Sequence, residues 1–180
     1  MCSSRQCILQ VEDDENDAFL VERAFARAGV NRPLRVARDG QQAVDYLSLA
    51  ESSVDPEQYP LPCLVLLDLN LPGMSGLDLL AWIRKQPRIK RLVVILFSSS
   101  VAPADVERAY ELGANSVVQK PNDLSQAAEF AQLLNGWWLG FNRFAAFEET
   151  QPPVYARACT AVDNAPCTVH NTTEATPSFP

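Results

Sequence analysis

The feature that most constrains the fold is an alternation between short apolar runs and longer segments with helical periodicity. Cys63–Leu67 and Leu92–Phe97 are continuous apolar runs, which is typical of parallel strands covered on both faces. Further short runs lie at 7–11, 34–37 and 116–119, and a segment with helical spacing follows each run. Five β-α units in succession predict an α/β fold, a doubly wound and mostly parallel sheet with helices on both faces.

Glycine and proline mark where several of these helices stop. Gly29, Pro87 and Gly113 each follow a segment with helical periodicity, and both residue types commonly end helices. We expect the helices at residues 18–28, 41–50, 75–86, 103–112 and 123–147.

Two segments lie outside the repeating pattern. Residues 51–62 form a polar connection that contains prolines. Residues 151–180 contain five prolines and three charged residues and have no periodic apolar pattern. Such a segment cannot bury enough apolar surface to fold, so we expect one domain at 6–147 and a flexible tail at 151–180.

Composition excludes several classes of function. The net charge of −7 argues against a nucleic-acid binder, which normally presents a basic face. The apolar runs are far shorter than the ~20 residues of a membrane span, and no signal-peptide core is found. We therefore expect a cytoplasmic protein with reduced cysteines.

Five basic residues that cluster in the sequence are interpreted as a solvated helix end and loop: Arg84, Lys85, Arg88, Lys90 and Arg91.

Chemically active residues follow four of the predicted strands. Glu12 and Asp13 come after the first strand, Asp68 ends the third, Ser98 ends the fourth and Lys120 follows the fifth. Because ligands of such sheets bind at the carboxyl ends of the strands, we expect these side chains to meet at one edge.

This combination suits phosphoryl transfer. Carboxylates of Glu12, Asp13 and Asp68 are the hard oxygen ligands that Mg²⁺ prefers. Asp68 could then attack a phosphoryl group as a nucleophile. Transfer requires neutralised phosphoryl oxygens, which the Lys120 ammonium and the Ser98 hydroxyl could contact.

The chain resembles the receiver domains of two-component signalling over about residues 6–140. The motifs that carry the resemblance are VEDD at 11–14, LLDLNLPGMSG at 66–76, SS at 98–99, GA at 113–114 and KP at 120–121. The spacings from residue 68 to 98 (30) and from 98 to 120 (22) also suit that family.

The resemblance implies a fold, a cofactor and residue roles. It implies a flavodoxin-like five-stranded parallel sheet of order 2-1-3-4-5, with helices on both faces. Glu12 and Asp13 would be the acid pair for Mg²⁺, with Asp68 as phosphorylation site and metal ligand. The Asn70 main-chain carbonyl would be a further metal ligand. Ser98 would fill the hydroxyl position, and Lys120 would contact the phosphate.

The resemblance also suggests partners. The connection at 51–62 and the LLDLNLPGMSG motif are similar to small single-domain regulators associated with bacterial phytochromes. The phosphoryl donor would be a sensor histidine kinase, with a bacterial phytochrome as a candidate, or a phosphotransfer protein. Related receivers often dimerise through the face formed by the fourth helix, fifth strand and fifth helix.

One residue departs from the family pattern. Val117 occupies the fifth-strand position, three residues before Lys120, where many receivers carry Tyr or Phe. Valine has no ring that could swing inward, so we expect an incomplete aromatic switch.

Aromatic residues crowd the end of the last predicted helix. Trp137, Phe141 and Phe144 follow helical spacing, whereas Trp138 and Phe147 lie off that stripe. Core packing is the favoured interpretation of the stripe. The two residues off it would then leave some aromatic surface for a partner or a second copy.

Three functions remain open on the sequence. The leading hypothesis is a stand-alone phosphorelay module, not an enzyme acting on a separate substrate, with output by protein–protein contact. A degenerate receiver that binds partners without being phosphorylated is an alternative. A phosphatase with Asp68 as covalent nucleophile is disfavoured. Hydrolases of the haloacid-dehalogenase type carry a second aspartate two residues after the nucleophile, whereas this chain has Asn70 there.

Overall fold

The computed structural model describes residues 6–52, 55–99 and 102–144. The chain divides into two units, 1–149 and 150–180. The predicted tail at 151–180 and the last three residues of the predicted helix at 123–147 lie outside the described residues.

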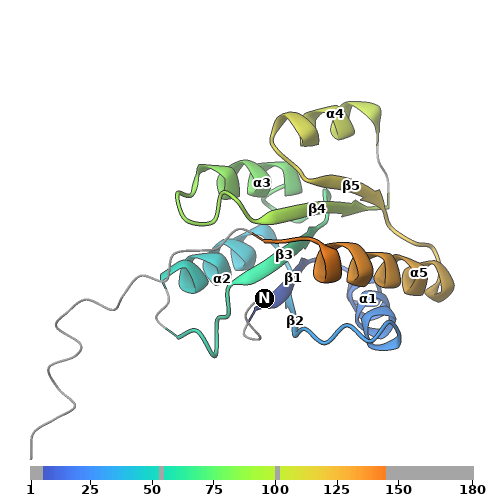
Figure 1. Ribbon diagram of the computed structural model, residues 1–180. Helices are drawn as coiled ribbons and strands as arrows, with labels where there is room; N and C mark the ends of the chain where they lie inside the picture. The colour runs from blue at the N-terminus through green and yellow to red at the C-terminus, as the bar shows by residue number, and fades with distance from the viewer. Residues whose placement is uncertain (1–5, 53–54, 100–101, 145–180) are drawn as a thin grey trace, which may run out of the picture. The chain divides into compact units, whose positions relative to one another are not determined.

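A five-stranded sheet forms the centre of the first unit (Figure 1). Its strands are β1 (Cys7–Val11), β2 (Leu34–Ala37), β3 (Pro62–Leu67), β4 (Val93–Ser98) and β5 (Ser116–Gln119). All four neighbouring pairs are parallel, and the order is β2-β1-β3-β4-β5. The predicted flavodoxin-like topology is confirmed.

Helices cover both faces of this sheet. They are α1 (Glu15–Arg27), α2 (Gly40–Ser52), α3 (Gly76–Lys85), α4 (Pro103–Glu111) and α5 (Leu124–Leu134), and the π-helix η1 (Asn135–Phe141) continues from α5. In Figure 1, α1 and α5 lie on one side of the sheet, and α2 and α3 lie on the other.

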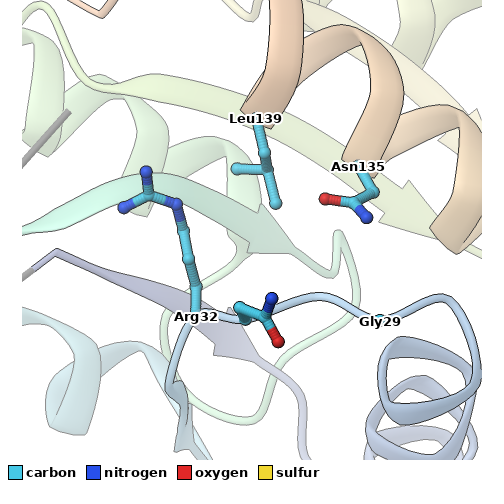
Figure 2. A pocket seen from close by; sticks show the side chains of 5 residues that line it. Gly29, Arg32, Asn135 and Leu139 are labelled. Atoms are coloured by element: carbon cyan, nitrogen blue, oxygen red, sulfur yellow. The ribbon is translucent and has the colours of Figure 1, made fainter. Parts of the chain in front are cut away.

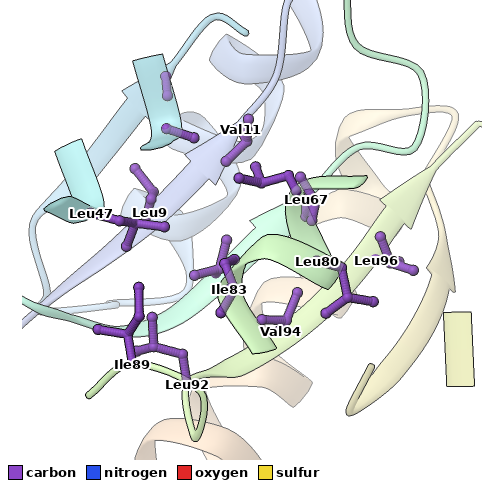
Figure 3. Close-up of a cluster of buried hydrophobic side chains, with 14 of the residues drawn as sticks. Leu9, Val11, Leu47, Leu67, Leu80, Ile83, Ile89, Leu92, Val94 and Leu96 are labelled. Atoms are coloured by element: carbon purple, nitrogen blue, oxygen red, sulfur yellow. The ribbon is translucent and has the colours of Figure 1, made fainter. Parts of the chain in front are cut away.

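Alternating strand residues supply two separate hydrophobic cores. Leu9 and Val65 belong to the core that also takes in Leu80 of α3 (Figure 3). Ile8 and Leu64 belong to the core under α1 and α5. Because side chains alternate along a strand, covering both faces explains why these strands have continuous apolar sequences.

The first helix begins earlier than its apolar pattern predicts. The pattern predicts a start at Ala18, but α1 begins at Glu15. The Asp14 side chain accepts hydrogen bonds from the backbone N–H groups of Asn16 and Asp17. These bonds satisfy donors that a helix start leaves free, so the helix extends back to the strand end.

The prediction of one long last helix is wrong in part. The α-helix ends at Leu134, and a π-helix follows to Phe141. Its i→i+5 pattern is visible in the Asn142 N–H, which donates to the Trp137 carbonyl at 2.8 Å. Asn142 is extended, so Phe144 lies beyond the end of the helix.

This change overturns the interpretation of the aromatic stripe for Trp137 and Phe141 but not for Phe144. Trp137 and Phe141 are 66% and 79% exposed, whereas Trp138 and Phe144 pack partly against the core under α1 and α5. A π turn contains more residues than an α turn, so the 3.6-residue spacing no longer identifies the buried face. Phe147 lies outside the described residues.

The basic cluster is not entirely a solvated surface. Arg84 donates hydrogen bonds to the backbone carbonyls of Gly113, Lys90 and Leu92 and to the Asn115 side chain. Arg84 therefore links α3 to the segments around β4 and β5. Within 6–52, 55–99 and 102–144, the structure has no helix with the length and hydropathy of a membrane span.

Candidate functional site

Four strands bring the candidate residues to the carboxyl edge of the sheet. Glu12 directly follows β1, Asp68 directly follows β3, and Lys120 directly follows β5. Ser98 is the last residue of β4. All four are buried, although each is polar or charged. Because burying charges without partners is costly, their contacts define what the site can do.

Three carboxyl groups come together at this edge. Ligand oxygens of Glu12, Asp13 and Asp68 all lie within 4.8 Å of one another. Mg²⁺ is bound by oxygens at about 2.1 Å, so these acids are close enough to converge on one divalent cation when their side chains draw together around it.

Lys120 is the ammonium that pairs with the buried acids. Its Nζ lies 2.6 Å from Glu12 Oε2 and 2.6 Å from Asp68 Oδ2. A third contact, of 2.9 Å, reaches Asp17 Oδ2 on α1. An ammonium group has three N–H donors, so each carboxylate takes one of them.

Burial and hydrogen bonding shift the pKa values of Glu12 and Lys120. Burial raises the pKa of Glu12 to about 7, and the hydrogen bond from Lys120 opposes that rise. Burial would lower the pKa of Lys120, but the hydrogen bonds to Asp68, Glu12 and Asp17 outweigh it and raise that pKa. The lysine therefore remains an ammonium at neutral pH and keeps a positive charge beside Asp68.

Ser98 places a buried hydroxyl at the same edge of the sheet. Its Oγ is buried and has no hydrogen-bond partner within the described part of the chain. Its backbone carbonyl accepts from the Lys120 N–H at 2.9 Å, which holds the ends of β4 and β5 together. A buried hydroxyl without a partner is costly, so it is available to an incoming acceptor oxygen.

Asn70 and Asp14 occupy supporting positions around the acids. The Asn70 N–H donates to Asp68 Oδ1 at 3.1 Å, which orients that carboxylate. The role of the Asn70 carbonyl as a metal ligand stays a prediction. Asp14 caps α1 and is not a member of the acid triad.

Sequence reasoning missed Asp17. The apolar pattern placed the start of α1 after this residue, and its carboxylate did not stand out among neighbouring acids. With α1 beginning at Glu15, Asp17 lies in the first turn, next to the strand ends. Asp14 as a helix cap was the signal that could have found it.

Val117 lies in β5, as the sequence predicts. Val117 is half-buried and packs against the core that α2, α3 and α4 share. An aliphatic side chain without a phenol therefore packs against this core, beside Leu96 of β4.

A separate cavity of about 330 Å³ lies away from the acids. Its walls come from the α1–β2 connection, with Gly29, Asn31 and Arg32, and from η1, with Asn135 and Leu139 (Figure 2). None of the predicted site residues lines this cavity, so it is not part of the acid site.

Comparison with known families identifies the domain. The family model described as "Response regulator receiver domain" matches residues 8–132. This chain belongs to the response regulator receiver family. The acid cluster therefore lies in a receiver, at the sheet edge where the sequence motifs predict it.

Curated relatives of this receiver extend the match beyond the family model. A "Probable methanogenesis regulatory protein FilR2" from Methanothrix harundinacea is 36% identical over 136 residues, covering 76% of this chain and 85% of the relative. "Response regulator Rcp1" from Synechocystis is 34% identical over 132 residues, covering 73% of this chain and 88% of that protein.

Solved structures of similar receivers include regulators named for phytochromes. A manganese-bound crystal structure of Rcp1 has a TM-score of 0.68 and covers 78% of this chain and 99% of its own. The phosphorylated "Cyanobacterial Phytochrome Response Regulator RcpA" has a TM-score of 0.69 at 31% identity, with coverage of 78% and 99%. The predicted resemblance to phytochrome-associated response regulators is confirmed.

Proposed function

We propose that this receiver accepts a phosphoryl group on Asp68 from a phosphohistidine of a sensor kinase or a phosphotransfer protein. The observation that carries the proposal is the placement of Lys120 Nζ 2.6 Å from Asp68 Oδ2, beside an acid triad. Each part has a task in phosphoryl transfer, which depends mainly on positioning and charge neutralisation.

The donor set fits a magnesium ion. Glu12, Asp13 and Asp68 offer carboxylate oxygens, and these three acids carry more negative charge than Lys120 can balance. Mg²⁺ prefers such oxygen ligands together with phosphate oxygens. When bound, the ion would neutralise charge on the phosphoryl oxygens. The manganese-bound Rcp1 structure supports a divalent cation in a related receiver.

The chain's own residues divide the work of transfer. A carboxylate oxygen of Asp68 attacks phosphorus, the P–N bond to the donor imidazole breaks, and the departing nitrogen retains the bonding electrons and takes up a proton. The Lys120 ammonium donates to one phosphoryl oxygen, and the Ser98 hydroxyl can donate to another. The product is an acyl phosphate on Asp68.

A small phosphodonor tests this proposal directly. The protein is incubated with Mg²⁺ and acetyl phosphate and analysed by intact-mass spectrometry. We expect one added phosphoryl group, labile in base, on the wild type and none on Asp68→Asn. Asp45→Asn is the matched control, because Asp45 is an exposed acid on α2, and it should be modified like the wild type.

Two results would contradict the proposal. Absence of an adduct on the wild type would favour a receiver that binds its partners without being phosphorylated. An adduct retained on Asp68→Asn would place the acceptor elsewhere. Sustained turnover of a phosphomonoester that Asp68→Asn abolishes would instead favour a phosphatase.

The partner and the output follow from the same reasoning. Relatives named as phytochrome response regulators support a bacterial phytochrome as one candidate kinase. We infer a cytoplasmic phosphorelay role with output through protein contacts, and the buried thiols of Cys7 and Cys63, which are not in a disulfide, fit a reducing compartment.

Self-association is the contact that the described surface supports best. Leu133, Trp137 and Phe141 are 66%, 66% and 79% exposed and follow one another at intervals of four residues. Exposed aromatic residues mark protein interfaces. We propose that this stripe takes part in a homodimer.

A further inference from the structure

Asp17 contacts the same ammonium group as Asp68 but belongs to a different element. It lies in the first turn of α1, and its Oδ2 is 2.9 Å from Lys120 Nζ. Its own backbone N–H donates to the helix cap Asp14 at 3.2 Å. The carboxylate that reaches Lys120 is therefore attached to a backbone that the cap holds in place.

The other two carboxylates that contact Lys120 have a second task. Glu12 and Asp68 are members of the acid triad, and Asp68 is also the proposed phosphoryl acceptor. Asp17 is not a member of the triad. Asp17 is therefore the one of the three carboxylates that contacts Lys120 without belonging to the triad.

We propose that Asp17 is a positioning residue that keeps the Lys120 ammonium directed at the phosphoryl group on Asp68. This inference rests on the proposed phosphoacceptor function. A lysine side chain has many rotamers, and ordering it costs free energy. A partner on a rigid helix removes part of this cost before the donor arrives, which is how pre-positioned groups accelerate transfer.

The test compares two variants that remove the same charge from the same turn. Asp17→Asn loses the carboxylate that pairs with Lys120, whereas Glu15→Gln loses an exposed carboxylate of the first turn of α1. Both variants lose one negative charge from the same helical turn, so Glu15→Gln controls for the change in net charge. Because repulsion of the donor by Asp17 is relieved at least as much as repulsion by Glu15, a slower reaction of Asp17→Asn with acetyl phosphate at saturating Mg²⁺ reports lost positioning. We expect Asp17→Asn to react roughly five- to tenfold more slowly than Glu15→Gln.

Three further measurements separate positioning from a purely structural role. Mg²⁺ affinity, measured by calorimetry, should agree within about twofold between these two variants, because Asp17 lies outside the triad. In a Lys120→Gln background, Asp17→Asn should cause no additional slowing, since the group that it positions is absent. Asp17→Glu, which retains a carboxylate, should recover most of the rate.

Several outcomes would overturn the inference. Equal rates for Asp17→Asn and Glu15→Gln would show that only charge matters. Loss of Mg²⁺ affinity in proportion to the rate would place Asp17 at the metal site, and slowing that persists without Lys120 would rule out the lysine as its target. An unmodified wild type would instead overturn the phosphoacceptor function, and this inference with it.

Discussion

Gly76 begins α3 directly against the backbone of the residue that carries the proposed phosphoryl group. A Cβ atom at this position would overlap the carbonyl group of Asp68 and crowd Leu69. The Gly76 N–H also donates to the Leu69 carbonyl at 2.9 Å. The absence of a side chain therefore lets the helix start lie close to the strand end, which helps to hold Asp68 at the sheet edge.

Gly76→Ala should therefore destabilise the protein and disturb Asp68. We expect a loss of about 3 kcal/mol in the free energy of unfolding, because neither backbone can yield without strain. Urea unfolding measures this loss, and acetyl phosphate should label the folded variant more slowly than the wild type.

Gly136→Ala is the matched control for this substitution. A Cβ atom at Gly136 would meet no atom within 4 Å, so the free energy of unfolding should change by less than about 1 kcal/mol. A Gly76→Ala variant as stable as the Gly136→Ala variant would contradict the close-approach argument.

At the scale of elements, Arg84 connects the end of α3 to the two strands beside it. Its Nε and Nη2 donate to the Gly113 carbonyl at 2.9 and 2.7 Å, and its Nη1 donates to the Leu92 carbonyl at 3.0 Å. Burial lowers the pKa of this guanidinium. The planar guanidinium holds its N–H donors in a fixed arrangement and can donate to several acceptors at once, whereas a lysine ammonium is a compact point charge.

Replacing the Arg84 guanidinium should weaken the attachment of α3 to the segments that precede β4 and β5. Arg84→Met should lower the free energy of unfolding by about 2 kcal/mol or more, because several carbonyls would lose a charged donor. Lys85→Met provides the comparison, since Lys85 is exposed on the same helical turn, and it should change stability by less than about 0.5 kcal/mol. Similar losses in urea unfolding of both variants would show that Arg84 makes no special link.

For the whole molecule, the exposed side chains of Leu133, Trp137 and Phe141 predict a dimer that substitutions at these positions should disrupt. Trp137→Ser with Phe141→Ser should convert a dimer into a monomer in sedimentation velocity experiments, because the substitutions remove the largest exposed apolar side chains of η1. Phe19→Ser is the control, since Phe19 on α1 is 56% exposed but lies outside the stripe. A wild type that sediments as a strict monomer with and without phosphorylation would refute the proposed dimer.

Sequence patterns predicted most of the fold for a simple physical reason. Strands buried on both faces need continuous apolar runs, and the runs ending at Val11, Leu67 and Phe97 were each recognisable within a residue of their observed ends. Parallel strands end at one edge, so the sequence predicted that Glu12 and Asp68 would meet there, and the family resemblance supplied the strand order that makes β1 and β3 neighbours.

The tertiary structure decided the contacts that depend on helix phase and packing. Asp17 reaches Lys120 across 103 residues of sequence because α1 starts close to the end of β1 and the parallel strands β1 and β5 end at the same edge of the sheet. The π-helix likewise determines that Trp137 is exposed, and the spacing of apolar residues in the sequence does not predict a π-helix. The amino-acid sequence by itself determined which chemical groups arrive at the sheet edge. Packing determined which of them touch, because hydrogen bonds and ion pairs depend on distances that only the folded chain fixes.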